Sequence, residues 1–194
     1  ETLAIMEDGT LKIIDGYETT DPDLTGVKHT FHFGPYLIKD GVKRTTFPGK
    51  SEYIEDQKHP RQAIGQRADG TIVIITVDGR SDIAEGMDLH ELADLFEQQE
   101  CVVAYNLDGG GSAQSFVEGQ PLNVYSDGME RKIGDFIYFT KDDIEIIEGD
   151  KSGLISSQEF DLVRGQDVYK VPIPGKGINV GTFFSHKDNK PFKL

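Results

Sequence analysis

The sequence predicts an α+β domain with a mixed, largely antiparallel sheet, built from hairpins with one βαβ crossover and few helices. Three observations carry this prediction. Asp-Gly pairs separate short β-prone runs, and Asp-Gly accepts the positive φ values that tight hairpin turns require. One segment has the apolar spacing of an amphipathic helix. It lies between two apolar runs, which is the order expected for a crossover connection.

The hairpins are expected at three Asp-Gly pairs. Asp8-Gly9 separates the strands of an N-terminal hairpin, and Asp40-Gly41 and Asp69-Gly70 stand in the same way between apolar runs. The last pair leads into residues 71–77, Thr-Ile-Val-Ile-Ile-Thr-Val, which form the strongest predicted strand. Its almost continuous apolar run indicates burial on both faces.

The helix is expected over residues 88–99, because Asp88 and Glu91 have the spacing of a capping box. A second strand is predicted directly afterwards, at residues 102–106. The two strands and the helix between them would form a right-handed crossover with parallel strands. The apolar stripe of the helix, at i, i+3, i+4 and i+7, consists of Leu89, Leu92, Ala93 and Phe96.

The composition excludes several classes of protein. The chain has 194 residues, of which 37% are hydrophobic, enough for one domain with a core. A formal net charge of −14 argues against nucleic acid or an anionic membrane as a partner, but not against a small anion held by a local Arg. No run approaches the roughly 18 apolar residues of a membrane span, so membrane insertion is not expected. The single Cys101 excludes an internal disulfide and is expected to be buried and inert.

The character of the sequence changes after residue 148. Residues 1–148 hold the expected strands and helix and form the main part of the domain. Residues 149–177 are predicted to be a linker or extension, since they begin with a Gly-, Asp- and Ser-containing stretch. Residues 178–194 form a separate segment.

Two predicted loops could carry chemistry, because ligands collect at the carboxyl ends of parallel strands. The first is Asp78-Gly79-Arg80, and the second is residues 106–112, Asn-Leu-Asp-Gly-Gly-Gly-Ser. Three consecutive glycines allow a ligand to approach the backbone N–H groups, which suits a phosphate oxygen. No Lys follows them, which disfavours a nucleoside triphosphate site. A bland flexible turn stays the alternative.

Three charged residues are candidates at this edge. Arg61 would enter the strand that pairs with residues 71–77, and its guanidinium could grip a phosphate in bidentate fashion. Asp78 and Asp108 would lie one strand apart, and paired carboxylates are typical of glycosidases. The alternatives are a surface salt bridge for Arg61 and turn-forming roles for the aspartates. The five histidines show no metal-ligand spacing, and Ser112 lacks the Gly-x-Ser-x-Gly context of a serine hydrolase.

These motifs resemble the phosphodiester glycosidase family, whose relatives include bacterial and phage proteins. The resemblance covers residues 1–148 in order. It implies hydrolysis of a sugar-1-phosphodiester, such as N-acetylglucosamine-1-phosphate linked to a sugar or to a cell-envelope polymer, between the anomeric carbon and the phosphate oxygen. The matching segments are Phe33–Gly41, Pro60–Gly65, Val77–Arg80, Gly86–Ala93, Asn106–Ala113 and Ser126–Arg131.

The resemblance also implies roles for individual residues. Asp78 and Asp108 are the candidate catalytic base and nucleophile, in either order. No cofactor is required, and a divalent cation held by these two carboxylates and backbone carbonyls is left open. Arg61 and the glycine amides would hold the phosphate, while Arg80 would contact the anion or pair with a carboxylate. The expected substrate-binding residues are Arg61, Arg80, Asn106, Gly109, Gly110, Gly111, Ser112, Asn179 and Thr182.

The order of the motifs departs from the family pattern. The family normally begins with Asn-x-Gly-x-Phe, and here that pattern stands at residues 179–183. Reading Leu194 onto Glu1 restores the usual order, so we expect a circular permutant, which requires only that the original termini lie close together. The alternative is a fragment whose last residues complete a neighbouring copy.

A second function stays open, a non-catalytic glycan-binding module of a phage tail or cell-envelope protein. Such modules rely on exposed aromatic rings, and Tyr36, Tyr53, Phe116 and Tyr125 could serve. In either case the expected partner is a small or polymeric phosphoglycan, and the resemblance favours an extracellular or virion-associated setting. Homo-oligomerisation is left open.

Overall fold

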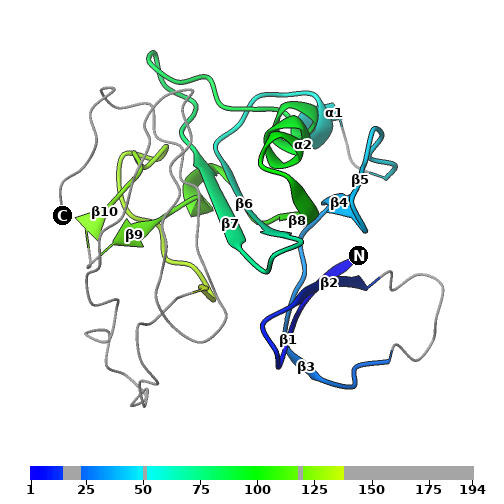
Figure 1. Cartoon of the computed structure of the whole chain (residues 1–194). Coiled ribbons are helices and arrows are strands. Elements are labelled where there is room, and N and C mark those ends of the chain that lie inside the picture. Colours follow the sequence, from blue (N-terminus) through cyan, green and yellow to red (C-terminus); the bar gives the residue numbers. More distant parts are fainter. Residues whose placement is uncertain (15–22, 50–51, 118–119, 138–194) are drawn as a thin grey trace.

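The computed structural model describes residues 1–14, 23–49, 52–117 and 120–137 (Figure 1). The predicted linker at residues 149–177 and the segment 178–194 lie outside the described residues. The same holds for Asn179 and Thr182. The domain boundaries and the circular permutation therefore stay predictions.

A five-stranded sheet lies at the centre of the molecule, in the order β5-β4-β8-β6-β7 (Figure 1). All of its pairings are antiparallel. Two small antiparallel sheets accompany it, β2-β1-β3 and β10-β9. The central strands are β4 (Tyr36–Lys39), β5 (Val42–Lys43), β6 (Arg61–Arg67), β7 (Ile72–Val77) and β8 (Cys101–Asn106). The others are β1 (Thr2–Met6), β2 (Leu11–Ile14), β3 (Val27–Phe31), β9 (Phe116–Val117) and β10 (Gln120–Pro121).

The three hairpins are confirmed. Asp8-Gly9 joins β1 to β2, Asp40-Gly41 joins β4 to β5, and Asp69-Gly70 joins β6 to β7, each as an antiparallel pair. The glycine of each pair has a positive φ, as a tight turn requires. These turns set the local pairing of the strands.

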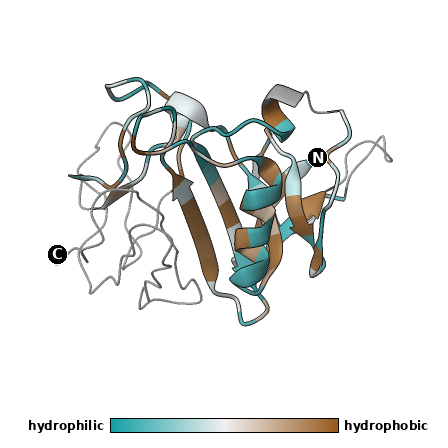
Figure 2. Cartoon of the chain, turned by 90° about the horizontal axis from the view of Figure 1, so that it is seen from above, coloured by the Kyte–Doolittle hydropathy of each residue, from teal (hydrophilic) through white to brown (hydrophobic). Residues whose placement is uncertain are grey.

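The described helices are short α1 (Glu52–Glu55), α2 (Leu89–Gln98) and the 3₁₀ turn η1 (Gly110–Ser112). The capping box at α2 is confirmed, because Asp88 Oδ1 accepts from the Glu91 N–H at 2.8 Å and Glu91 Oε2 accepts from the Asp88 N–H at 3.2 Å. The predicted apolar stripe of α2 is buried. In Figure 2 the outer side of α2 is hydrophilic, whereas the central strands are mostly hydrophobic. No helix within the described ranges is long and apolar enough to cross a membrane.

The fold class is confirmed, but the crossover differs from a simple βαβ unit. β7 and β8 are both antiparallel to β6 and therefore parallel to each other, yet β6 lies between them. The reason is that the hairpin gives one edge of β6 to β7 and leaves its other edge for β8. The registers pair Arg61 with Val77 and Ala63 with Asn106. The start of β6 therefore lies beside the ends of β7 and β8.

Both faces of the central sheet are covered, which explains the continuous apolar run of β7. On one face, α2 packs against residues such as Val73, Ile75 and Ala104. On the other, residues of β1 and β2 pack against Ile72 and Tyr105. Cys101 lies in the α2 core, and burial raises the pKa of its thiol to about 12. Its predicted burial is confirmed.

Candidate active site

Three segments meet at one end of the central sheet, as predicted. They are the start of β6, the loop after β7 (residues 78–80) and the loop after β8 (residues 106–112). The Gly110 N–H donates to the Pro60 carbonyl at 2.9 Å, and a Cβ on Gly109 would lie 3.6 Å from the Arg61 Cα. Arg80 Nη1 lies 3.0 Å from the position of a Cβ on Gly110. The Arg61 backbone and the triple-glycine turn thus lie on the same side of the molecule.

Arg61 is buried, with 3% of its surface exposed, although it begins β6. Its Nε donates to the Met87 carbonyl at 2.8 Å, and its Nη2 donates to the carbonyls of Ile54 and Gln57 at 2.8 and 3.0 Å. The guanidinium thereby ties the region of α1 and the entry to α2 to the sheet. This geometry favours an anchoring role, and the phosphate contact of Arg61 stays a prediction.

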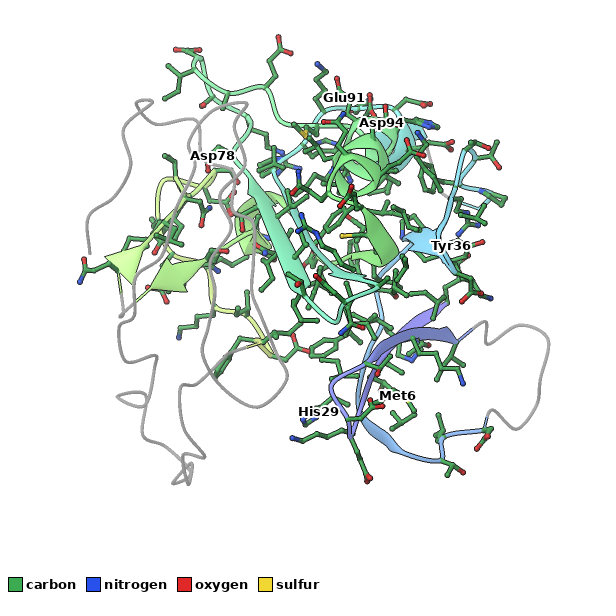
Figure 3. The ribbon with its side chains drawn as sticks, viewed as in Figure 1. Met6, His29, Tyr36, Asp78, Glu91 and Asp94 are labelled. Atoms are coloured by element: carbon green, nitrogen blue, oxygen red, sulfur yellow. The ribbon has the colours of Figure 1, made fainter. Side chains whose placement is uncertain are left out.

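Asp78 and Asn106 are buried as well. Asp78 is 3% exposed at the end of β7 (Figure 3), and its Oδ1 accepts from the Val124 N–H at 3.0 Å. Asn106 is fully buried, and its Nδ2 donates to the Gly34 carbonyl at 2.9 Å. The Asn106 Oδ1 has no hydrogen-bond partner within the described part of the chain. We call Arg61, Asp78 and Asn106 the inner layer, because each binds the backbone of another segment.

Arg80, Asp108 and Arg131 are exposed at the same end of the sheet, and we call them the rim. Arg80 lies against Gly110, and its Nη2 is 3.3 Å from the Nδ1 of His59. Arg131 Cζ lies 2.7 Å from the position of a Cβ on Gly111. Two guanidinium groups therefore flank consecutive glycines, and the Arg131 guanidinium is ion-paired with the Asp127 carboxylate.

The glycine loop (Gly109–Gly111) packs against the protein itself. A Cβ on Gly109 would lie 2.5 Å from the Pro60 carbonyl oxygen, and a Cβ on Gly111 would overlap the Asp127 carboxylate. The Gly110 amide is committed to Pro60, so the loop can offer a ligand at most the amides of Gly109 and Gly111. The glycines are needed here for close packing, as well as for any ligand approach.

The rim includes one residue that sequence reasoning did not single out. Arg131 makes an ion pair with Asp127, with Nη2 and Oδ2 2.5 Å apart, and its Nη1 lies 3.4 Å from Ser112 Oγ. This places Ser112 beside the rim, and its contact with a substrate stays a prediction. The resemblance of Ser126–Arg131 to a family segment was the signal that could have identified Arg131.

One group among the described residues has carboxylate and imidazole atoms close enough to share a metal ion. It consists of Glu55, Asp56 and His90, whose ligand atoms all lie within 4.8 Å of one another. His90 Nε2 is 3.5 Å from Glu55 Oε1 and 3.8 Å from Asp56 Oδ1, so contacts between the imidazole and the two carboxylates account for the arrangement. The group joins the end of α1 to the first turn of α2 and includes neither Asp78 nor Asp108.

Known proteins are similar to this chain. A prophage-derived protein of Bacillus subtilis (strain 168), SPbeta YomE, is 44% identical over 138 residues, which cover 70% of this chain and 21% of that protein. Human N-acetylglucosamine-1-phosphodiester alpha-N-acetylglucosaminidase is 39% identical over 137 residues, which cover 63% of this chain and 26% of the enzyme. The chain thus spans about a fifth to a quarter of the length of these relatives.

The fold also has a match among solved structures. The auto-inhibited catalytic domain of the zebrafish N-acetylglucosamine-1-phosphodiester alpha-N-acetylglucosaminidase superposes with a TM-score of 0.52 at 24% identity, covering 64% of this chain and 44% of that one. Residues 1–140 match the family model described as phosphodiester glycosidase. The motifs that predicted this resemblance lie within the match, and the chain therefore belongs to the phosphodiester glycosidase family.

Proposed function

We propose that the chain is a glycoside hydrolase that cleaves a sugar-1-phosphodiester between the anomeric carbon and the phosphate oxygen. The observation that carries the proposal is that an exposed carboxylate, Asp108, directly precedes the glycine loop, which two guanidinium groups flank. Family membership supports phosphodiester glycosidase chemistry in general. Water adds across the broken bond, so that its hydroxyl joins the sugar and its proton goes to the departing phosphate.

The phosphate is held by the rim in this proposal. Arg80 supplies positive charge, Arg131 supplies further N–H donors while it is paired with Asp127, and the amides of Gly109 and Gly111 add hydrogen-bond donors. Arg61 contributes by holding the sheet end in place, because its guanidinium already donates to three carbonyls. A phosphate monoester is a good leaving group, so this grip replaces much of the general-acid help that a poorer leaving group needs.

Asp108 is the carboxylate assigned to direct contact with the reacting sugar. Its exposure leaves it accessible to a substrate, and an anionic oxygen stabilises an oxocarbenium-like centre or attacks it. Asp78 is the second carboxylate, buried beneath the rim, and it also holds the backbone at Val124. No cofactor is part of the proposal.

The substrate class follows from the relatives. One is named for N-acetylglucosamine-1-phosphodiesters and another is prophage-derived. We therefore propose N-acetylglucosamine-1-phosphate linked to a sugar or to a bacterial envelope polymer as the substrate.

The test is to incubate the full chain with the methyl phosphodiester of N-acetylglucosamine-1-phosphate in ¹⁸O-labelled water. Mass spectrometry then shows where the label goes. Label in the freed sugar is expected, since the anomeric carbon–oxygen bond breaks. Label in the phosphate would mean that the phosphorus–oxygen bond breaks and would overturn the proposal. Binding without any release would favour the glycan-binding module.

The structure offers that alternative little support from its described aromatic rings. The Arg44 guanidinium covers the Tyr36 ring at 4.2 Å from its centroid. Phe116 and Tyr125 pack against each other, with centroids 6.4 Å apart. Rings that already stack on side chains of the same protein have less surface to offer a sugar.

A further inference from the structure

His59 is a buried residue at the candidate site that neither the motifs nor the proposed function uses. It lies directly before Pro60 and the start of β6, and 7% of its surface is exposed. Its backbone pairs with Met87 in both directions, at 3.1 and 3.0 Å. A Cβ on Gly86 would overlap the His59 backbone, so the two segments pack without a side chain between them. The position of the His59 backbone is therefore firmly set.

The imidazole of His59 contacts the rim. Arg80 Nη2 lies 3.3 Å from His59 Nδ1. A guanidinium can only donate hydrogen bonds, so Nδ1 must accept and the proton of the neutral ring must be on Nε2. The Arg80 guanidinium also lies against Gly110, with its Nη1 3.0 Å from the position of a Cβ. Arg80 thus contacts both a buried imidazole and the glycine loop.

The backbone conformation of Arg80 is a second sign that its position is constrained. Its φ is +58°, in the left-handed region that side chains other than glycine avoid. In the described residues two other non-glycine positions share this feature: Asp40 lies in a hairpin turn and Glu100 follows the end of α2. Arg80 directly precedes the bridge between Ser81 and Ala84, and its N–H donates to the Glu85 carbonyl at 3.4 Å. Such conformations cost about 1–3 kcal/mol and cluster at ligand clamps, where the surrounding structure enforces them.

We propose that His59 is a positioning residue, whose Nδ1 orients the Arg80 guanidinium over the glycine loop so that it meets the phosphate of the substrate. The inference rests on the proposed function and deepens it by assigning affinity for the phosphate to a His–Arg pair. His59 itself does not touch the substrate. Gly110 belongs to this arrangement, because a Cβ there would crowd the Arg80 guanidinium at 3.0 Å.

The test compares two variants that differ in one acceptor. His59→Asn retains an oxygen near the position of Nδ1, whereas His59→Leu keeps a similar volume and removes the acceptor. For His59→Leu we expect the KM for the phosphodiester to rise about tenfold with kcat within about twofold, the scale of one charge-assisted hydrogen bond. His59→Asn should stay within about threefold of the native KM. Equal effects of both variants, or a loss confined to kcat, would overturn the inference.

A double-mutant cycle and a binding assay make the result independent of turnover and of folding. Calorimetry measures the affinity of the full chain for N-acetylglucosamine-1-phosphate, and thermal unfolding shows which variants are folded. His59→Leu should weaken binding in the native background and have little effect beside Arg80→Gln, because the two residues act as a unit. Additive losses would contradict the pairing. If His59→Leu does not fold, His59→Asn and Arg80→Gln still test the inference. It would be contradicted if His59→Asn weakened binding as much as Arg80→Gln does.

The imidazole also has a spectroscopic signature. At about pH 8, long-range ¹H–¹⁵N correlation spectra should show His59 with its proton on Nε2, and Arg80→Gln should shift the Nδ1 resonance. A proton on Nδ1 would refute the inference. Absent turnover combined with the expected binding and spectra would reject the proposed function and retain the His59 role. Normal turnover of the native chain, together with unchanged substrate binding by His59→Leu, would retain the proposed function and reject the His59 role.

Discussion

The inner layer and the rim lie at the same end of the sheet and contain the same kinds of residue, yet their surroundings are opposite. Arg61, Asp78 and Asn106 are between 0% and 3% exposed, and each bonds to the backbone of another segment. The rim residues are exposed, and Arg80 and Arg131 contact side chains and glycines. Within one motif, the buried polar residues thus stabilise the fold, and the exposed ones are accessible to a ligand.

In each of the two loops, the buried residue comes first and the exposed residue comes later. In the loop after β7, Asp78 is buried and Arg80 two residues later is exposed; in the loop after β8, Asn106 is buried and Asp108 two residues later is exposed. A buried polar group that loses its partner leaves others unsatisfied, while an exposed one is compensated by water. Substitutions in the inner layer should therefore act on stability, and substitutions in the rim on activity.

The largest effect is expected for Arg61→Leu. Removing the guanidinium leaves carbonyls around α1 without their donor, so the free energy of unfolding should fall by about 3 kcal/mol. Urea unfolding followed by circular dichroism measures it. Arg61→Lys is the matched control and should lose part of this stability, because one ammonium does not reproduce the fork. A loss below about 1 kcal/mol would show that Arg61 does not stabilise the fold as expected for the inner layer.

Asp108→Asn tests the rim. Turnover of the phosphodiester should fall at least about 100-fold, the usual scale for a positioned acid–base group, which corresponds to about 2.7 kcal/mol in the barrier. The free energy of unfolding should change by less than about 0.5 kcal/mol, because the side chain is exposed. Near-normal turnover would show that Asp108 is not catalytic.

Cys101 tests burial at the opposite end of β8 from Asn106, within the core beneath α2. Burial raises the pKa of its thiol from 9.0 to about 12, so the folded chain keeps the proton after the unfolded chain has lost it. Ionisation of the thiol in the unfolded chain therefore lowers the free energy of unfolding as the pH rises above 9. The free energy of unfolding should fall by about 1 kcal/mol between about pH 9 and 10, and Cys101→Ala should flatten that slope. An identical slope in the variant would mean that the thiol is accessible in the folded chain.

The smallest effect is expected for Asp127→Asn. The ion pair between Asp127 and Arg131 is short, at 2.5 Å, but the two side chains are 35% and 46% exposed. Exposed pairs contribute little, so thermal unfolding should show a loss of less than about 0.5 kcal/mol. A loss above about 1 kcal/mol would show that this pair supports the fold in the way the inner layer does.

Local chemistry in the sequence determined much of this structure. The Asp-Gly turns, the Asp88–Glu91 capping box and the apolar stripe of α2 involve residues that are close in the chain, so each could be predicted by itself. The same patterns placed the loops after β7 and β8 at one edge and led to the family. Turn and cap geometry depends on a few neighbours, which is why these predictions were confirmed.

The tertiary structure alone decided the neighbours of each strand and the burial of each charge. No local pattern shows that β6 lies between β7 and β8, because that depends on which edge remains after the hairpin has formed. The carbonyl that Arg61 binds at Met87 is 26 residues away, and the one that Asn106 binds at Gly34 is 72 residues away. The role of a polar side chain depends on whether it is buried against such distant backbone or exposed to water. Only the folded chain brings that backbone into place.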